Sequence, residues 1–309
     1  TEKDAEVRTV LERSLAATVL AFGKTSADRI QAVATLGTYA DPGVSARLKS
    51  LLIKDNKGAF LEKDAGIRKA AQTALDEIGE RVVFWNFVGK LFQGLSLGSV
   101  LLLAAIGLAI TFGVMGVINM AHGEMVMIGA YTTFVIQEVI RTSAPALFDA
   151  SIIIAIPMAF LVAGAFGVAI ERGIIRYLYG RPLETLLATW GLSLILQQLV
   201  RTIFGPTNKE VGNPSWMNGA IQLDGGALLT YNRIWIIVFS IVVVALLALV
   251  LKKTAFGLQM RAVTQNRRMA SAMGIRTGWV DAMTFGLGSG IAGIAGVALS
   301  QIDNVSPNL

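Results

Sequence analysis

The chain has 309 residues, of which 54% are hydrophobic and 16% are charged, whereas soluble domains carry about 25% charged residues. It contains no cysteine and a single histidine, so disulfides and thiolate sites are excluded, a zinc or haem centre is disfavoured, and we expect no cofactor. The net charge of +6 comes from basic residues beside apolar segments, which membrane topology explains better than nucleic acid does. We therefore expect contact with membrane lipid and no nucleic-acid partner.

Charged residues divide the chain into two regions. Residues 1–85 hold 13 of the 27 Lys and Arg and 12 of the 21 Asp and Glu, although they make up little more than a quarter of the chain. We therefore predict an all-α protein, with a soluble helical domain over residues 1–85 and a transmembrane domain over residues 90–309.

The first region contains a weak internal repeat. Three of its residues recur at an offset of 39 positions: Arg29, Ala32 and Leu36 reappear as Arg68, Ala71 and Leu75. Paired-helix repeats of the HEAT type have about 40 residues each. The sequence thus predicts a HEAT-like helical region, with a generic helical domain as the alternative.

Six apolar segments follow, and their lengths suit helices that cross a bilayer with some tilt. They cover residues 93–117, 120–140, 151–171, 184–203, 233–251 and 281–301. The sequence therefore predicts a polytopic transmembrane helical bundle. Loops 172–182 and 252–280 together carry nine Lys and Arg, against four on the other side, which places these loops in the cytoplasm. Counting back, region 1–85 is extracytoplasmic, and this requires a signal sequence upstream of the first residue.

The junction of the first two segments carries three polar side chains at membrane depth, those of Asn119, His122 and Glu124. The uncharged part of the second segment, residues 125–137, is too short to span a bilayer, so that segment must take in His122 and Glu124. Ionisable groups at this depth usually serve a function, and these groups can donate and accept hydrogen bonds. We therefore predict a path for a small polar solute. Two residues of the fourth segment are predicted to extend this path, Thr189 and Gln197, with hydrogen bonding between helices as the alternative. The alternatives are that Asn119 caps the second helix, or that the two segments meet in a re-entrant turn.

Loop 252–280 is predicted to contain a short amphipathic helix over residues 258–273. Three residues spaced by four positions form one small face on it: Ala262, Asn266 and Ala270. Arg261 adds a positive charge, and Gly274, followed by Ile275, ends the helix as a C-cap. Because small residues permit another backbone to approach closely, we predict that this helix docks a cytoplasmic partner. The alternative is a helix that rests on anionic lipid.

The last apolar segment contains the pattern Gly-x-Gly-x-x-Gly at residues 288–293. A dinucleotide site requires this pattern between a strand and a helix, and here it lies inside an apolar span. Four glycines are instead expected to pack closely against other helices: Gly286, Gly290, Gly293 and Gly296. The sequence has no nucleophile with a base, no paired catalytic carboxylates and no P-loop, so the chain is not expected to be an enzyme.

Residues 113–124, Gly-Val-Met-Gly-Val-Ile-Asn-Met-Ala-His-Gly-Glu, resemble the hallmark of permease subunits from branched-chain amino-acid-type ABC importers. Loop 257–275 is similar to the cytoplasmic coupling loop of that family, although it departs from the general Glu-Ala-Ala motif of ABC permeases. Residues 259–270 and 284–308 look more closely like the B-type permease of urea ABC importers, a subfamily that also has an extra helical region before its first span.

This resemblance implies a multi-pass permease of the bacterial inner membrane that imports urea or a short amide. Its implied partners are a second permease subunit, two cytoplasmic ATPases and an extracytoplasmic solute-binding protein. It also implies that coupling to the ATPases runs through loop 252–280 and that further spans follow residue 309, so the transmembrane domain is expected to be incomplete. The first alternative is a branched-chain amino-acid permease. The second is a membrane scaffold or receptor that transports nothing.

Overall fold

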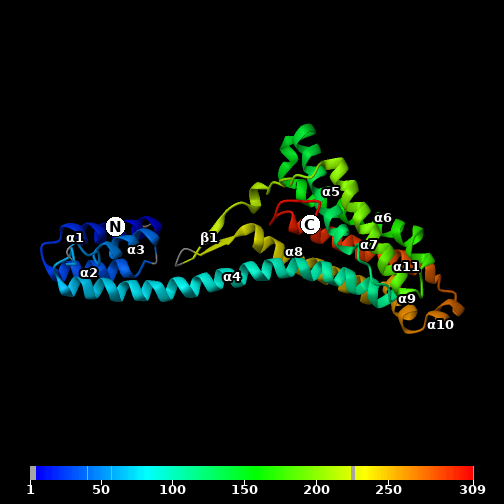
Figure 1. The fold of residues 1–309 in the computed structure, drawn as a ribbon, viewed down its shortest axis with the longest axis horizontal. Coiled ribbons are helices and arrows are strands. Elements are labelled where there is room, and N and C mark those ends of the chain that lie inside the picture. Colours follow the sequence, from blue (N-terminus) through cyan, green and yellow to red (C-terminus); the bar gives the residue numbers. More distant parts are fainter. Residues whose placement is uncertain (1–4, 40, 57, 224–226, 309) are drawn as a thin grey trace. The chain divides into compact units, whose positions relative to one another are not determined.

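The computed structural model describes residues 5–39, 41–56, 58–223 and 227–308, and these residues are mostly helical (Figure 1). In chain order the elements are α1 (Ala5–Phe22), α2 (Ser26–Gly37), α3 (Pro42–Ser50), α4 (Ala65–Met115), α5 (His122–Ser143), η1 (Pro145–Ala150), α6 (Ser151–Gly173), η2 (Ile175–Tyr177), α7 (Pro182–Phe204), η3 (Ser215–Met217), β1 (Ala220–Gln222), β2 (Leu228–Thr230), α8 (Tyr231–Lys253), α9 (Ala255–Gln265), α10 (Arg267–Ala272) and α11 (Thr277–Leu299). The two strands form a small sheet that the sequence did not predict.

The chain forms two compact units. The N-terminal unit comprises residues 1–93 and 220–229, and the C-terminal unit comprises residues 94–219 and 230–309. The first unit therefore extends beyond the predicted boundary at residue 85. Helix α4 has 51 residues and no proline, and it runs through residues 85 and 93 without interruption.

The N-terminal unit packs α1, α2, α3 and the start of α4 around its own apolar core. Thr25 caps α2 by accepting a hydrogen bond from the backbone N–H of Asp28, and Asp64 accepts from Gly66 at the start of α4. These two residues are 39 positions apart, the offset of the sequence repeat. Ala32 and Ala71, which are also related by that offset, both lie in the core.

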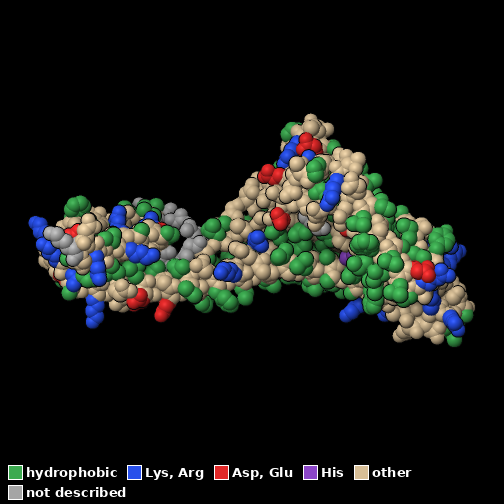
Figure 2. All heavy atoms as spheres, viewed as in Figure 1, with side chains coloured by type: hydrophobic (Ala, Val, Ile, Leu, Met, Phe, Trp, Pro, Cys, Tyr) green, Lys and Arg blue, Asp and Glu red, His purple; other side chains and the backbone are tan. Residues whose placement is uncertain are grey.

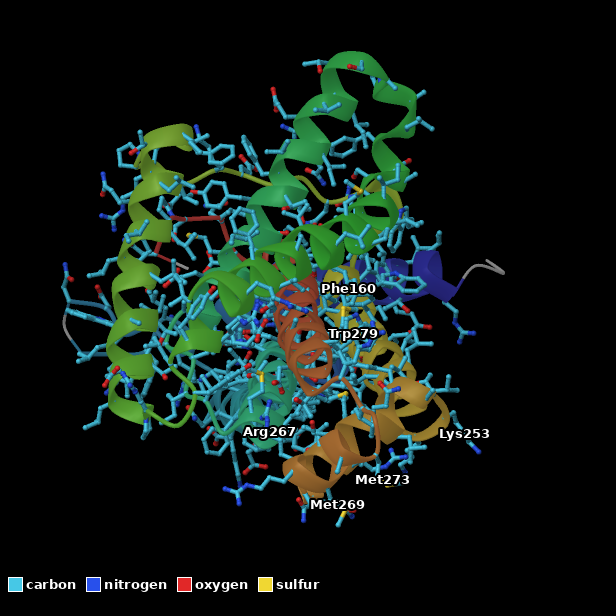
Figure 3. The ribbon with its side chains drawn as sticks, turned by 90° about the vertical axis from the view of Figure 1, so that its right-hand side faces the viewer. Phe160, Lys253, Arg267, Met269, Met273 and Trp279 are labelled. Carbon is cyan, nitrogen blue, oxygen red and sulfur yellow. The ribbon has the colours of Figure 1, made fainter. Side chains whose placement is uncertain are left out.

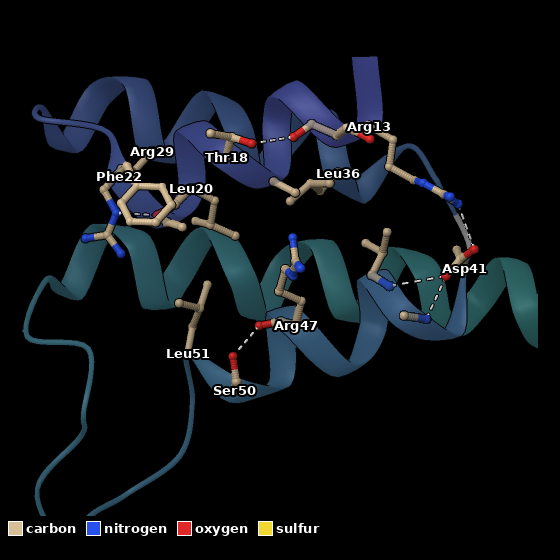
Figure 4. Close-up of a pocket in the computed structure, with 15 residues that line it drawn as sticks. Arg13, Thr18, Leu20, Phe22, Arg29, Leu36, Asp41, Arg47, Ser50 and Leu51 are labelled. Atoms are coloured by element: carbon tan, nitrogen blue, oxygen red, sulfur yellow. Dashed lines mark hydrogen bonds and ion pairs between the residues drawn. The ribbon is translucent and has the colours of Figure 1, made fainter. Parts of the chain in front are cut away.

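A groove of about 780 Å³ runs along the N-terminal unit beside α1 and α3 (Figure 4). Leu20 and Leu36 lie on its apolar side, and an ion pair between Arg13 and Asp41 (2.8 Å) borders one end. The pair is more than a third exposed on both sides, so it adds little to stability.

The C-terminal unit is built around α11. In the most apolar stretch of α11, 83% of the residues are buried, against 22–33% in the other four helices of comparable apolarity. Helices α5 and α6 both pack along it. On the face of this unit seen in Figure 2, hydrophobic side chains cover the middle of the helices and charged side chains gather toward their ends.

Within the described ranges, five helical segments are long and apolar enough to cross a membrane: α4, the segment Pro145–Tyr177 that contains α6, α7, α8 and α11. The sequence predicted six spans, and the remaining candidate is α5. This helix has 22 residues, but Glu124 lies in its first turn and Arg141 in its last. Twelve of its residues are buried, so most of α5 faces protein.

Glycines allow α11 to approach its neighbours closely. A Cβ on Gly286 would lie 2.7 Å from Val168 of α6, and one on Gly290 would lie 2.6 Å from the ring of Phe160, which Figure 3 places where α6 crosses α11. A Cβ on Gly293 would lie 2.6 Å from Ala163, and one on Gly296 would lie 2.8 Å from the backbone nitrogen of Ala130 in α5. All four predicted packing glycines therefore lie at helix crossings with no room for a side chain.

Candidate functional site

The link between α4 and α5 places the polar residues of the junction. Gly116 adopts φ +64°, a left-handed conformation that favours glycine, and ends α4. The Oδ1 atom of Asn119 accepts a hydrogen bond from the backbone N–H of Ala121 (3.0 Å). Ala121 is the N-cap residue of α5, and no side chain caps that helix. Asn119 therefore shapes the turn before α5 and does not cap it.

Glu124 forms a buried hydrogen-bond network with α7. Ser193 donates its hydroxyl hydrogen to Oε1 of Glu124 (2.5 Å), and Nε2 of Gln197 donates to the same oxygen (3.0 Å). The side chains of Glu124 and Ser193 are both buried. The network thus joins two predicted site residues, Glu124 and Gln197, through a third that the sequence did not single out.

Thr189 connects the same face of α7 to the junction. Its hydroxyl oxygen accepts a hydrogen bond from the backbone N–H of Met120 (3.1 Å). Thr189, Ser193 and Gln197 are spaced by four residues, which aligns them on one face of a helix. That spacing is the signal by which Ser193 could have been found. The polar face of α7 therefore lies against the start of α5.

His122 turns away from this network, toward α4. Its Nε2 atom lies 2.8 Å from the carbonyl oxygen of Ala104, and because a carbonyl can only accept, Nε2 must carry the hydrogen. The other ring nitrogen, Nδ1, is buried and has no hydrogen-bond partner among the described residues. His122 and Glu124 are two positions apart on a regular helix, so they face different neighbours. The predicted path residues thus fall into an α7 group and a separate contact with α4.

The predicted docking helix over residues 258–273 is wrong as a single helix. Asn266 has extended backbone angles (φ −154°, ψ 95°) and separates α9 from α10. Its Oδ1 atom accepts a hydrogen bond from the N–H of Met269 (3.0 Å), so asparagine acts here as an N-cap that starts a new helix. The four-residue spacing of Ala262, Asn266 and Ala270 therefore produces no common face.

The other residues predicted for this loop stabilise it from within. Ala270 is buried in a core cluster with Met260, Val263 and Val280, and Ala262 packs against that cluster. Ala270 is thus not available for a partner to contact, which corrects the prediction.

Gly274 adopts φ +89° and ends α10. The N–H of Ile275 donates to the carbonyl of Ala270 (3.1 Å) and the N–H of Gly274 to that of Ser271 (3.0 Å), which is a Schellman motif. Arg261 donates a hydrogen bond to the carbonyl oxygen of Leu251 at the end of α8. These residues therefore shape the loop.

The exposed side chains of α10 and its C-cap are not those predicted for docking. Met269 and Met273 are 60% and 78% exposed, and they lie at the outer edge of the unit in Figure 3. Arg268 beside them is also exposed. Exposed methionines are common on surfaces that adapt to a partner. In the part of the chain that the structure describes, no three His, Asp or Glu side chains gather into a possible metal site.

Comparisons with known proteins point to permeases of branched-chain amino acid transport systems. Residues 90–308 match the protein family described as branched-chain amino acid transport system / permease component. The high-affinity branched-chain amino acid transport system permease protein LivH of Salmonella typhimurium strain LT2 is 34% identical over 234 residues, which cover 72% of this chain and 73% of LivH. The Escherichia coli K12 LivH is 33% identical over 231 residues, with the same coverage. The permease protein BraD of Pseudomonas aeruginosa is 29% identical over 231 residues, 73% of this chain and 75% of BraD. No solved structure matches the chain.

Proposed function

Because the chain belongs to the family of branched-chain amino acid transport-system permease components and is thus a permease subunit of an importer, we propose that Glu124, Ser193 and Gln197 line its solute path and that the solute is urea or a short amide. The observation that carries this proposal is the buried network itself. It places the hydroxyl of Ser193 and the side-chain amide of Gln197 within 3.0 Å of one carboxylate oxygen of Glu124. Such groups match a small solute with several N–H donors and one carbonyl acceptor.

The charge of the network supports a neutral solute. Glu124 is its only ionisable member, and among the described residues no basic side chain hydrogen bonds to it. A zwitterionic amino acid would need a cationic or N–H-rich partner for its carboxylate. The similarity of residues 259–270 and 284–308 to urea permeases, and the helical region before the first span, point the same way.

A second candidate solute is a branched-chain amino acid. The specific observation in its favour is that LivH and BraD, at 29–34% identity, carry that function in their names. The two candidates separate in one experiment, in which the full-length permease is reconstituted with its partner permease, ATPases and binding protein, and radiolabelled urea uptake is measured with and without excess leucine. We expect ATP-dependent urea uptake that leucine does not inhibit. Uptake of leucine and not urea would favour the second candidate. Failure to transport either solute, with no association with ATPases, would favour a scaffold or receptor.

We further propose that α5 is a sixth membrane-crossing helix. At 1.5 Å per residue its 22 residues extend about 33 Å, enough for a hydrocarbon core of about 30 Å. Its charges fall near its two ends, and it packs mainly against α6 and α11. A helix that is covered by protein on several sides needs fewer apolar residues than one that faces lipid.

The HEAT-like N-terminal region is proposed to lie outside the cytoplasm, with loops 172–182 and 252–280 inside. The matching positions of Thr25 and Asp64 support the repeat, and the excess of Lys and Arg in the two loops supports the orientation. Since the chain has no cysteine, Asn56→Cys introduces a single thiol at an exposed position. A membrane-impermeant maleimide should label it in intact spheroplasts. Labelling only after the membrane is opened would reverse the orientation.

The loop that contains α9 and α10 is proposed to couple the permease to cytoplasmic ATPases. In this assignment Asn266, Gly274 and Ile275 define α10, while Arg261, Ala262 and Ala270 hold it in place. The contact surface is the exposed pair Met269 and Met273, with Arg268 beside it. The ATPases, a second permease subunit and an extracytoplasmic solute-binding protein are the proposed partners.

A further inference from the structure

Two buried carboxylates and two partly exposed side chains form a cluster at the end of the unit that carries α10. The guanidinium of Arg267 forms an ion pair with Asp281. The hydroxyl of Tyr179 donates a hydrogen bond to Glu171 (2.8 Å). The side chains of Asp281 and Glu171 are 0% and 1% exposed. Of these four residues, only Arg267 was singled out from the sequence, as one of the basic residues of loop 252–280.

The cluster joins elements that are far apart in the chain. Asp281 lies near the start of α11, Glu171 near the end of α6, and Arg267 at the first position of α10. Tyr179 belongs to the link between α6 and α7, and the Arg267 guanidinium lies 5.3 Å from the centre of its ring. In Figure 3 Arg267 lies between α10 and α11, on the side opposite Met269 and Met273. One guanidinium thus contacts both α11 and the link that follows α6.

Burial makes these contacts hard to break. Moving α10 away from α11 would remove Arg267 and leave the Asp281 carboxylate buried without its cation, which is strongly unfavourable. Burial also raises the pKa of Tyr179, and the carboxylates of Asp281 and Glu171 raise it further, so Tyr179 keeps its proton and remains a donor. Glu171 has its own cation nearby, the Arg172 guanidinium at 3.5 Å.

Helices α6 and α11, which carry Glu171 and Asp281, pack closely against each other. A Cβ on Gly164 of α6 would lie 3.2 Å from the carbonyl oxygen of Gly286 in α11. Because the two backbones are nearly in contact, a displacement of either helix must move the other. α10 has only six residues, too few to hold a position by itself. Its orientation therefore depends on the residues that attach it to α6 and α11.

We propose that Arg267, Asp281, Tyr179 and Glu171 form a coupling latch, which transmits movement of the docking helix α10 to α6 and α11 as one body. This inference rests on the proposed function, because it assumes that ATPases act on α10. The four are positioning residues: they contact neither solute nor nucleotide. One oxygen of each carboxylate, Glu171 Oε2 and Asp281 Oδ1, has no hydrogen bond among the described residues. Asp281 Oδ1 can therefore accept a further hydrogen bond from Arg267, whereas Glu171 Oε2 lies 3.5 Å from the Arg172 guanidinium.

The test uses the complete importer in proteoliposomes, with urea and, in parallel, leucine as the solute in the binding protein. The variants are Asp281→Asn, Arg267→Gln and their combination. The matched control is Glu184→Gln, which removes an exposed ion pair with Arg181 (3.1 Å) near the same link. The measured quantities are the amount of assembled complex, basal ATP hydrolysis, hydrolysis stimulated by solute-loaded binding protein, and uptake per complex.

In the Asp281→Asn complex we expect unchanged assembly and basal hydrolysis, while stimulated hydrolysis and uptake fall about tenfold, within the usual range of coupling between sites. The double variant should match Asp281→Asn alone, because both changes open the same contact. Glu184→Gln should behave like the unchanged protein. If Asp281→Asn does not assemble, Tyr179→Phe provides the same test, since it removes one hydroxyl and leaves both carboxylates and Arg267 in place.

Two results would overturn the latch. One is wild-type stimulation and uptake per complex in both Asp281→Asn and Tyr179→Phe. The other is a loss confined to the amount of complex, with normal uptake by the complexes that remain, because this would mean that the cluster only stabilises the fold. If the unmutated complex responds to neither solute, the proposed function fails instead, and the two failures are thereby distinguished.

Discussion

The crossing of α5 and α11 allows no side chain at Gly129. A Cβ built on this glycine would lie 2.5 Å from the Cα of Gly293 and still closer to its carbonyl oxygen. Backbone atoms cannot rotate away as the end of a side chain can. Gly129→Ala must therefore push α5 and α11 apart along a contact that is central to the C-terminal unit.

The size of the effect follows from two opposing terms. Overpacking a core costs about 1–3 kcal/mol, and contact with backbone favours the upper end, about 3 kcal/mol. Alanine recovers about 1 kcal/mol relative to glycine inside a helix. The net loss of about 2 kcal/mol corresponds to a fall in Tm of about 4–8 °C for a unit of this size.

The assay is thermal unfolding of the purified full-length protein in detergent, followed by tryptophan fluorescence. Gly98→Ala is the matched control, because Gly98 also lies inside an apolar helix but has nothing within 4 Å of the position that an added methyl group would take. It should leave Tm unchanged or raise it slightly. Equal Tm values for the Gly129 and Gly98 variants would refute the close crossing of α5 and α11.

Three further predictions concern other parts of the chain. Ser193→Ala removes the donor nearest Glu124 and should lower solute uptake about tenfold at normal membrane abundance, as loss of a hydrogen bond to a charged group does; unchanged uptake would exclude Ser193 from the path. Met273→Glu should weaken co-purification of the ATPases with the permease, whereas retention of the wild-type amount would place the docking surface elsewhere. Hydrogen bonding to Arg29 lowers the pKa of Glu62, so its stabilising contribution is complete above the unfolded pKa of about 4.3 and is lost as pH falls through the lower folded value. Glu62→Gln should remove that acid-dependent loss, which hydrogen exchange of α2 in the full chain, corrected for intrinsic rates, can measure; an identical pH profile in the variant would contradict it.

Helix positions in the C-terminal unit were predicted from the residues alone to within a few positions. The segments expected over 151–171 and 233–251 correspond to α6, Ser151–Gly173, and α8, Tyr231–Lys253. This works because a helix in a bilayer must satisfy its backbone hydrogen bonds within itself. Length, apolarity and flanking charge are then enough to locate it. The same local information indicated that Gly274 would end a helix, since its φ of +89° suits glycine in any surroundings.

Local patterns failed where a residue could satisfy two structures. Asn266 fits a four-residue helical spacing, yet its side chain bonds to the N–H of Met269 and divides the predicted helix. Ala270 looked like part of an open docking face, but Met260, Val263 and Val280 cover it. Spacing along a chain shows which residues share a face, whereas it does not show what the rest of the protein places against that face.

Pairings between distant segments came from tertiary packing. Ser193 meets Glu124 across 69 positions, and Arg267 meets Asp281 because α10 folds back toward the start of α11. Each pairing depends on how the helices are rotated about their axes, and glycine crossings such as that of Gly129 and Gly293 limit this rotation. The residue types made a helical membrane protein predictable because its backbone hydrogen bonds are local. Its polar site and latch were not predictable, because they depend on contacts between surfaces that are formed only when the helices pack.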